Sequence, residues 1–369
     1  MEKVVIRVVG FQLLNILLLF VITCLSEDTV PASFVFGDSI VDVGNNNYIV
    51  SLAKANYPPH GVDLGRATGR FTNGKTIADI IGEELGFIEF TPPFLSPNTT
   101  GQIVLKGVNY ASAAAGILNE TGMNFVGRIS FDAQIENFAK TRQYIMKTLG
   151  ESRAMTLLST ALFSVTIGSN DFINNYLIPV ATNIAQTTTP PTNFVAAMIS
   201  RYRIQLMRLY NMGARKIIVV NVAPVGCIPS QRELYNLSTA DGCAAFPNQL
   251  AQMFNNQLRI LVSNLSTSFE ESDFVYADAY RIVYDLIQNY SAYGFDNADS
   301  ACCHLAGRFG GLVPCTPASE VCEDRSKYVF WDTYHPTEAA NLFIAKRLLD
   351  GDSMDIWPKN IRHLISSSS

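Results

Sequence analysis

The chain has 369 residues, of which 48% are hydrophobic, so it is long enough to bury a sizeable core and is not a disordered protein. Its formal net charge is -5 at pH 7, from 27 Lys and Arg against 32 Asp and Glu. Because basic residues are not in excess, the chain lacks the electrostatic signature of a nucleic-acid-binding protein, and we expect neutral or apolar partners.

The beginning of the chain, residues 1–26, has the pattern of a secretory signal peptide. Lys3 and Arg7 form a basic start, an almost wholly apolar run follows, and Ser26 supplies a small residue for cleavage. An uncleaved membrane anchor is the alternative, because the run approaches the ~18 apolar residues that a spanning helix needs. The small residues at the exit favour the signal peptide. We therefore expect residues 27–369 to form a single secreted, monomeric domain, extracellular or in the cell wall, with no membrane span.

Short runs rich in Val, Ile, Phe and Tyr alternate along the chain with helical patterns. The runs predict buried strands at 33–36, 107–111, 162–167, 216–221 and 273–277. The helical patterns cover 76–85, 130–149, 192–212, 247–265 and 337–349. In the last of these we expect Pro336 to lie in the first turn. Strands that alternate with helices predict a parallel sheet covered on both faces, in one α/β domain.

Polar residues follow several of the predicted strands. In open α/β sheets, the residues that handle ligands gather outside the carboxyl ends of the strands. Ser39 follows the first strand, Gly116 the second and Asn170 the third. Asp332 and His335 follow a final extended run near the end of the chain. We expect these distant segments to converge at one edge of the sheet.

Ser39 and His335 could act on each other if this convergence holds. A hydroxyl nucleophile needs a general base, and that base needs a partner that fixes its tautomer, a task for which Asp332 is placed three residues earlier. The alternative is that 37–39 merely turns the chain, and that Asp332 caps a helix beside a packed imidazole. The segment 37–41 also lacks the second glycine of the nucleophile elbow found in ordinary α/β hydrolases.

An acyl-transfer nucleophile also requires hydrogen-bond donors for the oxyanion. The candidates are the backbone N–H of Ser39, the backbone N–H of Gly116 and the side-chain amide of Asn170. Gly116 and Asn170 each have another interpretation. Gly116 ends a run of small residues that could form a packed corner, and Asn170 lies in a segment that could be a plain turn.

Seven cysteines occur, and Cys24 falls in the predicted signal peptide. The other six are Cys227, Cys243, Cys302, Cys303, Cys315 and Cys322. An even number in a secreted chain predicts disulfides. The first two bracket one loop, and the adjacent Cys302 and Cys303 should each bond to one of the last two, in an order that the sequence leaves open. A zinc site is disfavoured because no C-x-x-C pair is present and the nearby His304 lacks a histidine partner.

Five Asn-x-Ser/Thr sequons add to the evidence for secretion, because such sites are glycosylated on secreted chains. They are Asn98, Asn119, Asn236, Asn264 and Asn289.

Four segments together resemble a known family. The segments 37–39, 109–116, 168–171 and 332–336 are similar, in this order, to the four blocks of the GDSL esterase/lipase family within the SGNH hydrolases. Their span covers nearly the whole mature chain, and the residues around the first and last blocks are similar to the plant branch of the family. The joint match is far more specific than any single block.

The resemblance implies a three-layer α/β/α sandwich around a central, mainly parallel five-stranded sheet, and hydrolysis of carboxylic esters. It implies that Ser39 is the nucleophile, His335 the base and Asp332 its orienting acid, with the Ser39 amide, Gly116 and Asn170 as the oxyanion hole. It implies no metal and no organic cofactor. Lipid acyl esters, acetylated polysaccharide and small acyl esters all fit this chemistry as substrates. The alternative is a catalytically inactive secreted binding or wall-associated protein on the same scaffold.

Overall fold

The computed structural model describes residues 30–178, 189–235, 242–269 and 271–366 of the chain. The predicted signal peptide, residues 1–26, lies outside the described residues.

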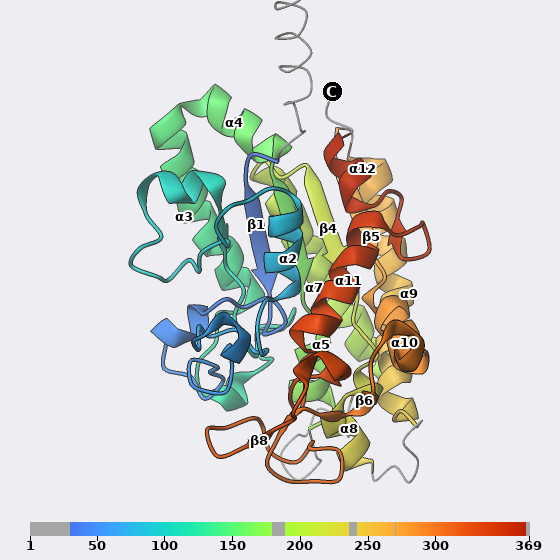
Figure 1. The fold of residues 1–369 in the computed structure, drawn as a ribbon. Coiled ribbons are helices and arrows are strands. Elements are labelled where there is room, and N and C mark those ends of the chain that lie inside the picture. The colour runs from blue at the N-terminus through green and yellow to red at the C-terminus, as the bar shows by residue number, and fades with distance from the viewer. Residues whose placement is uncertain (1–29, 179–188, 236–241, 270, 367–369) are drawn as a thin grey trace, which may run out of the picture.

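A six-stranded sheet forms the centre of the molecule, in the order β10-β5-β4-β3-β1-β2 (Figure 1). The strands are β1 (Ser33–Gly37), β2 (Gly107–Asn109), β3 (Leu162–Thr166), β4 (Lys216–Val220), β5 (Asp273–Ala277) and β10 (Ile356–Trp357). The first five are parallel and confirm the five strands predicted from the apolar runs. The sixth, β10, pairs antiparallel with β5 at the edge and is too short to produce a sequence pattern.

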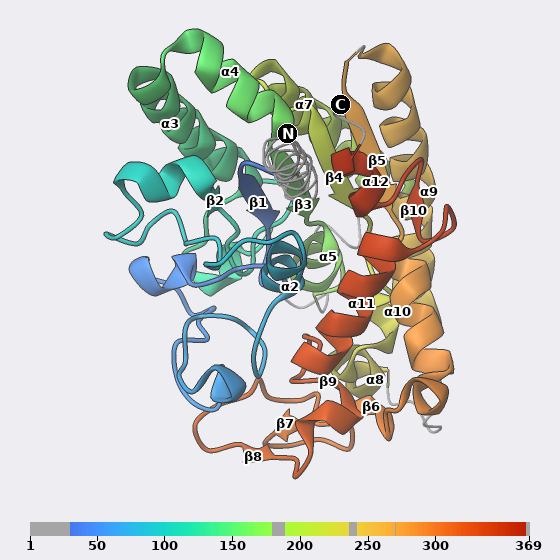
Figure 2. The ribbon, with the colours of Figure 1, turned by 45° about the horizontal axis from the view of Figure 1, so that its top comes forward.

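Helices cover both faces of this sheet (Figure 2). One face packs against α3 (Phe131–Leu149), α4 (Glu151–Thr160), α7 (Pro191–Asn211) and α9 (Ala245–Ser268). The other packs against α2 (Ile77–Glu84), α10 (Ala279–Gln288), α11 (Glu338–Asp350) and α12 (Ile361–Ser366).

The central strands are buried on both faces, which explains their unbroken apolar sequences. Side chains alternate along a strand, so on β4 Ile217 and Val219 join the core on the first face, while Ile218 and Val220 join the core on the second. The chain therefore forms the three-layer α/β/α sandwich that the resemblance implies.

The helix ends follow the expected capping chemistry. Thr76 caps α2 in a capping box with Asp79, and Ser130 caps α3 by accepting a hydrogen bond from Ala133 N. At α11 the expectation for Pro336 is wrong: Thr337 is the N-cap, so Pro336 lies before the helix, not in its first turn. The hydroxyl of Thr337 satisfies a free N–H of the first turn, which proline cannot do.

The extended run before Asp332 is not a strand of the central sheet. It forms β9 (Tyr328–Phe330), which pairs parallel with β6 (Asn297–Ala301) in a separate two-stranded sheet. A second small sheet joins β7 (Cys303–His304) to β8 (Glu320–Val321). These short strands carry the C-terminal part of the chain to the carboxyl ends of β1 and β3, where α11 begins.

Three disulfides are present, as the cysteine pattern predicts. Cys227 bonds to Cys243, which are 16 residues apart. The sequence leaves the pairing of the other four cysteines open. In the structure Cys302 bonds to Cys322, and Cys303 bonds to Cys315. The last four sulfurs pack around the buried Trp331.

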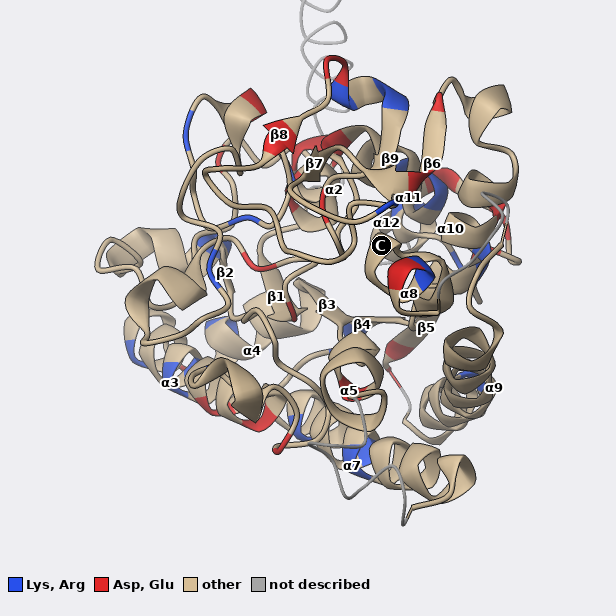
Figure 3. Ribbon diagram, turned by 90° about the horizontal axis from the view of Figure 1, so that it is seen from below, with Lys and Arg blue, Asp and Glu red and all other residues tan. Residues whose placement is uncertain are grey.

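Charged residues of both signs occur in similar numbers, as the net charge of -5 requires. Seen from the end of the molecule that carries β7 and β8, acidic and basic residues are interspersed around the ribbon (Figure 3). The sequon residues Asn98, Asn119, Asn264 and Asn289 are exposed, whereas Asn236 falls outside the described residues. Within the described ranges, no helix has both the length and the apolarity needed to cross a membrane.

An aromatic cluster fixes α3 against the middle of the sheet. The ring of Phe138 lies 5.3 Å from Phe34, 5.8 Å from Phe36, 5.3 Å from Phe163 and 6.0 Å from Tyr110. All five side chains are buried. Because β1 leads directly into Ser39, this cluster also anchors the strand that positions a candidate site residue.

We expect Phe138→Ala to lower the free energy of unfolding by about 3–5 kcal/mol, because it removes a buried ring that its neighbours cannot replace. Denaturant titration followed by circular dichroism measures the loss. The exposed Gln143→Ala on the same helix is the control and should change the free energy by less than about 0.5 kcal/mol. Equal effects of the two changes would show that the cluster does not anchor the fold.

Candidate active site

Ser39 lies on a tightly held turn at the carboxyl end of β1. The side chain of Gln134 accepts a hydrogen bond from Gly37 N at 3.0 Å and donates one to Gly37 O at 2.8 Å. Asp38 N donates to Thr166 O at 3.1 Å. A Cβ atom at Gly37 would lie only 2.4 Å from Thr166 O, so the close approach of β1 and β3 requires glycine here.

Buried amide and carboxylate side chains tie this turn to the end of β2. Asp42 accepts a hydrogen bond from Ala113 N at 3.0 Å. Asn45 donates to Asn109 O at 2.9 Å, and the Asn109 side chain donates back to Val41 O at 2.7 Å. Each of these bonds gives a backbone N–H or C=O group in this part of the chain a side-chain partner. They fix the run of small residues after β2 next to the Ser39 turn.

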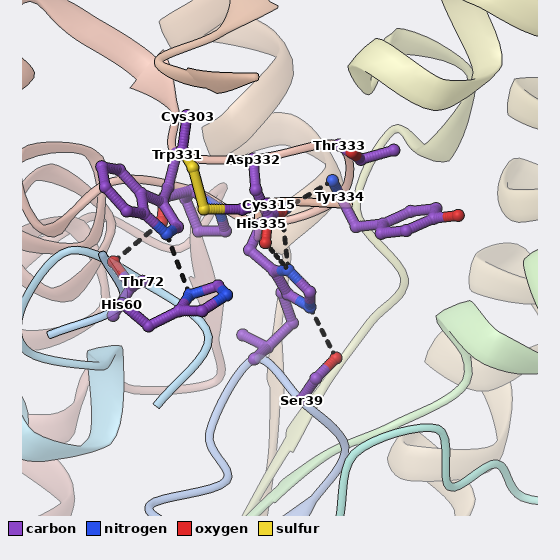
Figure 4. A network of polar contacts seen from close by, with 12 residues as sticks. Ser39, His60, Thr72, Cys303, Cys315, Trp331, Asp332, Thr333, Tyr334 and His335 are labelled. Atoms are coloured by element: carbon purple, nitrogen blue, oxygen red, sulfur yellow. Dashed lines mark hydrogen bonds and ion pairs between the residues drawn. A yellow bond between two sulfur atoms is a disulfide. The ribbon is translucent and has the colours of Figure 1, made fainter. Parts of the chain in front are cut away.

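His335 connects Ser39 to Asp332 (Figure 4). Its Nε2 lies 2.8 Å from Ser39 Oγ, although the two residues are 296 positions apart. Its Nδ1 lies 2.8 and 3.0 Å from the two carboxylate oxygens of Asp332. Burial by itself would raise the pKa of Asp332, but the His335 imidazole beside it holds that pKa below its usual value. The ionised carboxylate only accepts, so Nδ1 carries the proton and Nε2 is free to accept the Ser39 hydroxyl.

The loop that carries Asp332 is supported from several directions. Asp332 Oδ1 accepts hydrogen bonds from Tyr334 N and His335 N, and Trp331 N donates to His335 O at 2.8 Å. The Trp331 indole N–H donates to His60 Nδ1 at 3.1 Å (Figure 4). Burial lowers the pKa of His60 to about 4, so this imidazole stays neutral and able to accept.

The third segment of the site follows β3. The side-chain amide of Asn170 donates to Ala115 O at 3.0 Å, beside Gly116. Asp171 accepts hydrogen bonds from Ile117 N at 2.8 Å, from Leu118 N and from the Thr121 hydroxyl. The buried Asp171 therefore fixes the backbone directly after Gly116.

Gly116 is itself constrained by packing. A Cβ atom at Gly116 would lie 2.4 Å from Thr121 Cγ2 and 2.6 Å from Asp171 Oδ2. The predicted oxyanion residues Gly116 and Asn170 thus lie on two segments that contact each other. Asn170 lines the cavity that contains Ser39, whereas Gly116 is not among the residues that line it; Asn170 reaches the Gly116 segment through its bond to Ala115 O.

Asp38, next to Ser39, is a buried carboxyl group. Burial raises its pKa to about 7, although its Oδ1 accepts a hydrogen bond from Ile40 N at 3.1 Å. The group lines the cavity beside Ser39 and His335, so the electrostatics of the site depend on whether this carboxyl is protonated.

Ser39, Asn170, Asp332 and His335 line one cavity at the carboxyl ends of the strands. The loops around residues 57–70 and 296–324 also contribute to its wall. Within the described part of the chain, no cluster of His, Cys, Asp or Glu side chains could hold a metal ion. A hydroxyl, an imidazole and a carboxylate in hydrogen-bonded series can carry out nucleophilic catalysis with general acid–base assistance.

Several supporting residues give no clear signal in the sequence. Gln134, His60 and Asp171 lie far along the chain from the groups that they support, and each belongs to a residue type that is common in solvated helices, loops and turns. The Asp42-to-Asn46 segment does contain an unusual density of Asp and Asn. That density is a usable signal, because such side chains often replace missing backbone partners.

Comparisons with known proteins show which family the chain belongs to. A family model described as GDSL-like lipase/acylhydrolase matches residues 34–348. The chain is 56% identical over 347 residues to GDSL esterase/lipase At4g16230 of Arabidopsis thaliana, and this alignment covers 94% of each chain. It is 51% identical over 344 residues to GDSL esterase/lipase At3g50400 of the same plant, with 92% of each covered.

A crystal structure of an extracellular lipase from Streptomyces rimosus aligns with 92% of this chain and 100% of its own, at 13% identity. The TM-score of this alignment is 0.33. Because the family model matches most of the chain and more than half of the aligned residues are identical in each of the two plant relatives, the chain belongs to the GDSL-like lipase/acylhydrolase family.

Proposed function

We propose that this chain is a secreted serine esterase that hydrolyses carboxylic esters through an acyl-enzyme. The observation that carries the proposal is the series Ser39 Oγ, His335 Nε2, His335 Nδ1 and Asp332, joined by contacts of 2.8 to 3.0 Å. Family membership supports the same reaction class.

In the first half of the reaction, Ser39 Oγ attacks the ester carbonyl while its proton passes to His335 Nε2. Asp332 holds the Nδ1–H and stabilises the imidazolium that forms. The tetrahedral intermediate then collapses, the ester C–O bond breaks, and the leaving alcohol takes the proton from Nε2. The acyl group remains on Ser39.

In the second half, a water molecule gives a proton to His335 Nε2 and attacks the acyl carbonyl. Collapse of this second intermediate releases the carboxylic acid and returns the proton to Ser39. Both intermediates place negative charge on the former carbonyl oxygen. The Ser39 N–H, the Gly116 N–H and the Asn170 amide are the donors proposed to stabilise it.

Secretion is supported by features away from the site. Three disulfides suit an oxidising compartment, and four sequon residues are exposed and accessible to glycosylation. The apolar, basic-headed start of the sequence fits a signal peptide that is removed.

Ser39→Ala tests the assignment most directly. We expect it to lower kcat for p-nitrophenyl esters by about 10⁴–10⁶-fold, because the nucleophile is lost. A fluorophosphonate probe should label the unmodified chain at Ser39 and leave the Ala variant unlabelled. Unchanged turnover after the substitution contradicts the mechanism. A folded, glycosylated sample that resists labelling supports the alternative of an inactive binding protein.

Asn170→Ala tests the oxyanion hole. Loss of one donor should reduce kcat by about 10²–10³-fold with little effect on KM, since the hydrogen bond strengthens in the transition state. Asn256→Ala, on the exposed side of α9, is the control and should leave kcat unchanged. A kcat for Asn170→Ala within a factor of about two of the control would remove Asn170 from the hole.

The raised pKa of Asp38 predicts a pH-dependent stability. The folded chain keeps the Asp38 proton up to a pH of about 7, whereas the unfolded chain releases it near 3.8. The contribution of Asp38 to stability is therefore present below pH 3.8 and is lost as the pH rises to about 7. Asp38→Asn stays neutral, so its unfolding temperature should rise relative to the unmodified chain across this window. The surface change Asp296→Asn should show no such trend; a parallel pH dependence of Asp38→Asn and the unmodified chain would exclude a raised pKa.

A further inference from the structure

The cavity at Ser39 does not end at the catalytic groups. It has a volume of about 200 Å³ and continues past His335 into the space between the sheet and two helices. The walls of this inner arm are aliphatic side chains from β4, α10 and α11: Val220, Ala279, Val283, Ala340, Ile344 and Leu348.

The spacing of these residues shows that the arm follows the helices. Ala279 and Val283 are four residues apart on α10, so they share one face. Ala340, Ile344 and Leu348 are spaced by four on α11 and also share one face, which covers roughly 12 Å of helix length. Two aliphatic stripes therefore border an elongated space that begins at the end of α11 nearest His335.

The six aliphatic side chains that line the inner arm carry no hydrogen-bonding atom. The charged side chains on the cavity wall are Asp38, Lys54 and Asp332, and they belong to the end that holds Ser39. Asn221, next to Val220 in the chain, also lines the cavity, and its amide is already bonded, donating to Tyr276 Oη at 2.7 Å and accepting from Tyr280 N at 2.9 Å. A sugar or an alcohol placed deeper in the arm would lose its hydrogen bonds to water without replacing them.

We propose that the inner arm binds the hydrocarbon tail of the acyl group, so that the substrates are esters of linear medium- or long-chain fatty acids. This inference rests on the proposed esterase function. An acetyl group would fill only a small part of the cavity of about 200 Å³, because its methyl group is comparable in size to a water molecule of about 30 Å³. The alcohol part of the ester would occupy the outer end, where Leu52 is largely exposed and the cavity opens to solvent.

The test compares p-nitrophenyl esters of increasing chain length. We expect kcat/KM of the unmodified chain to rise from acetate to octanoate, by about fourfold for each methylene that leaves water. Ala279→Leu places three extra carbons in the arm and should lower the octanoate-to-acetate ratio of kcat/KM by about 50-fold. Leu348→Ala lengthens the arm and should raise the dodecanoate-to-octanoate ratio.

Ala339→Leu is the matched control, because Ala339 neighbours Ala340 on α11 but does not line the cavity. Its chain-length ratios should equal those of the unmodified chain. The inference is overturned if Ala279→Leu and Leu348→Ala, both folded by circular dichroism, keep the unmodified ratios. It is also overturned if acetate is the best ester of the series.

A binding measurement separates this inference from the catalytic proposal. Ser39→Ala should bind octanoic acid, measured by isothermal titration calorimetry, and adding Ala279→Leu to it should weaken that binding at least tenfold. Absence of turnover and of fluorophosphonate labelling in the unmodified chain would refute the esterase function, while octanoic acid binding would still support the cavity assignment. Equal binding by the single and double variants, or no binding, would refute the cavity assignment.

Discussion

The geometry of the site depends on one contact, the hydrogen bond between Ser39 and His335. It joins two segments that are 296 positions apart, at a separation of 2.8 Å. A hydrogen bond of this kind contributes only about 1 kcal/mol by itself, far less than the entropy of ordering two free loops. Both segments must therefore be held in place by other interactions before the two groups meet.

The two sides are held by different means. Ser39 is fixed through the two residues before it. The side chain of Gln134 bonds to both the N–H and the C=O group of Gly37, and Asp38 N donates to Thr166 O on β3. His335 is fixed by its own loop, in which Asp332 accepts both backbone and imidazole N–H groups. Asp332 therefore has a structural and an electrostatic task, and its low pKa serves both, since only an ionised carboxylate accepts all these bonds.

The same arrangement separates the polar chemistry from an apolar interior. The groups proposed to act on the ester gather at the carboxyl ends of the strands, while the space behind His335 is bounded by the aliphatic faces of α10 and α11. The amide of Asn221 is not free to bind a ligand. It donates to Asp278 Oδ1 and accepts from Tyr280 N, and so holds the start of α10 to the end of β4. One cavity can thus offer hydrogen bonds to a carbonyl at its outer end and none to whatever lies deeper.

The sequence by itself determined the five parallel strands, their helices and the blocks that carry Ser39, Asn170 and His335, because apolar periodicity and turn residues act locally. Tertiary structure decided what depends on distant partners. It placed β9 outside the central sheet, paired Cys302 with Cys322, set His60 against Trp331 and opened the cavity along α11. A periodic pattern shows which face of a helix is buried but not what lies against it, so a space between two apolar faces appears only when both are in position.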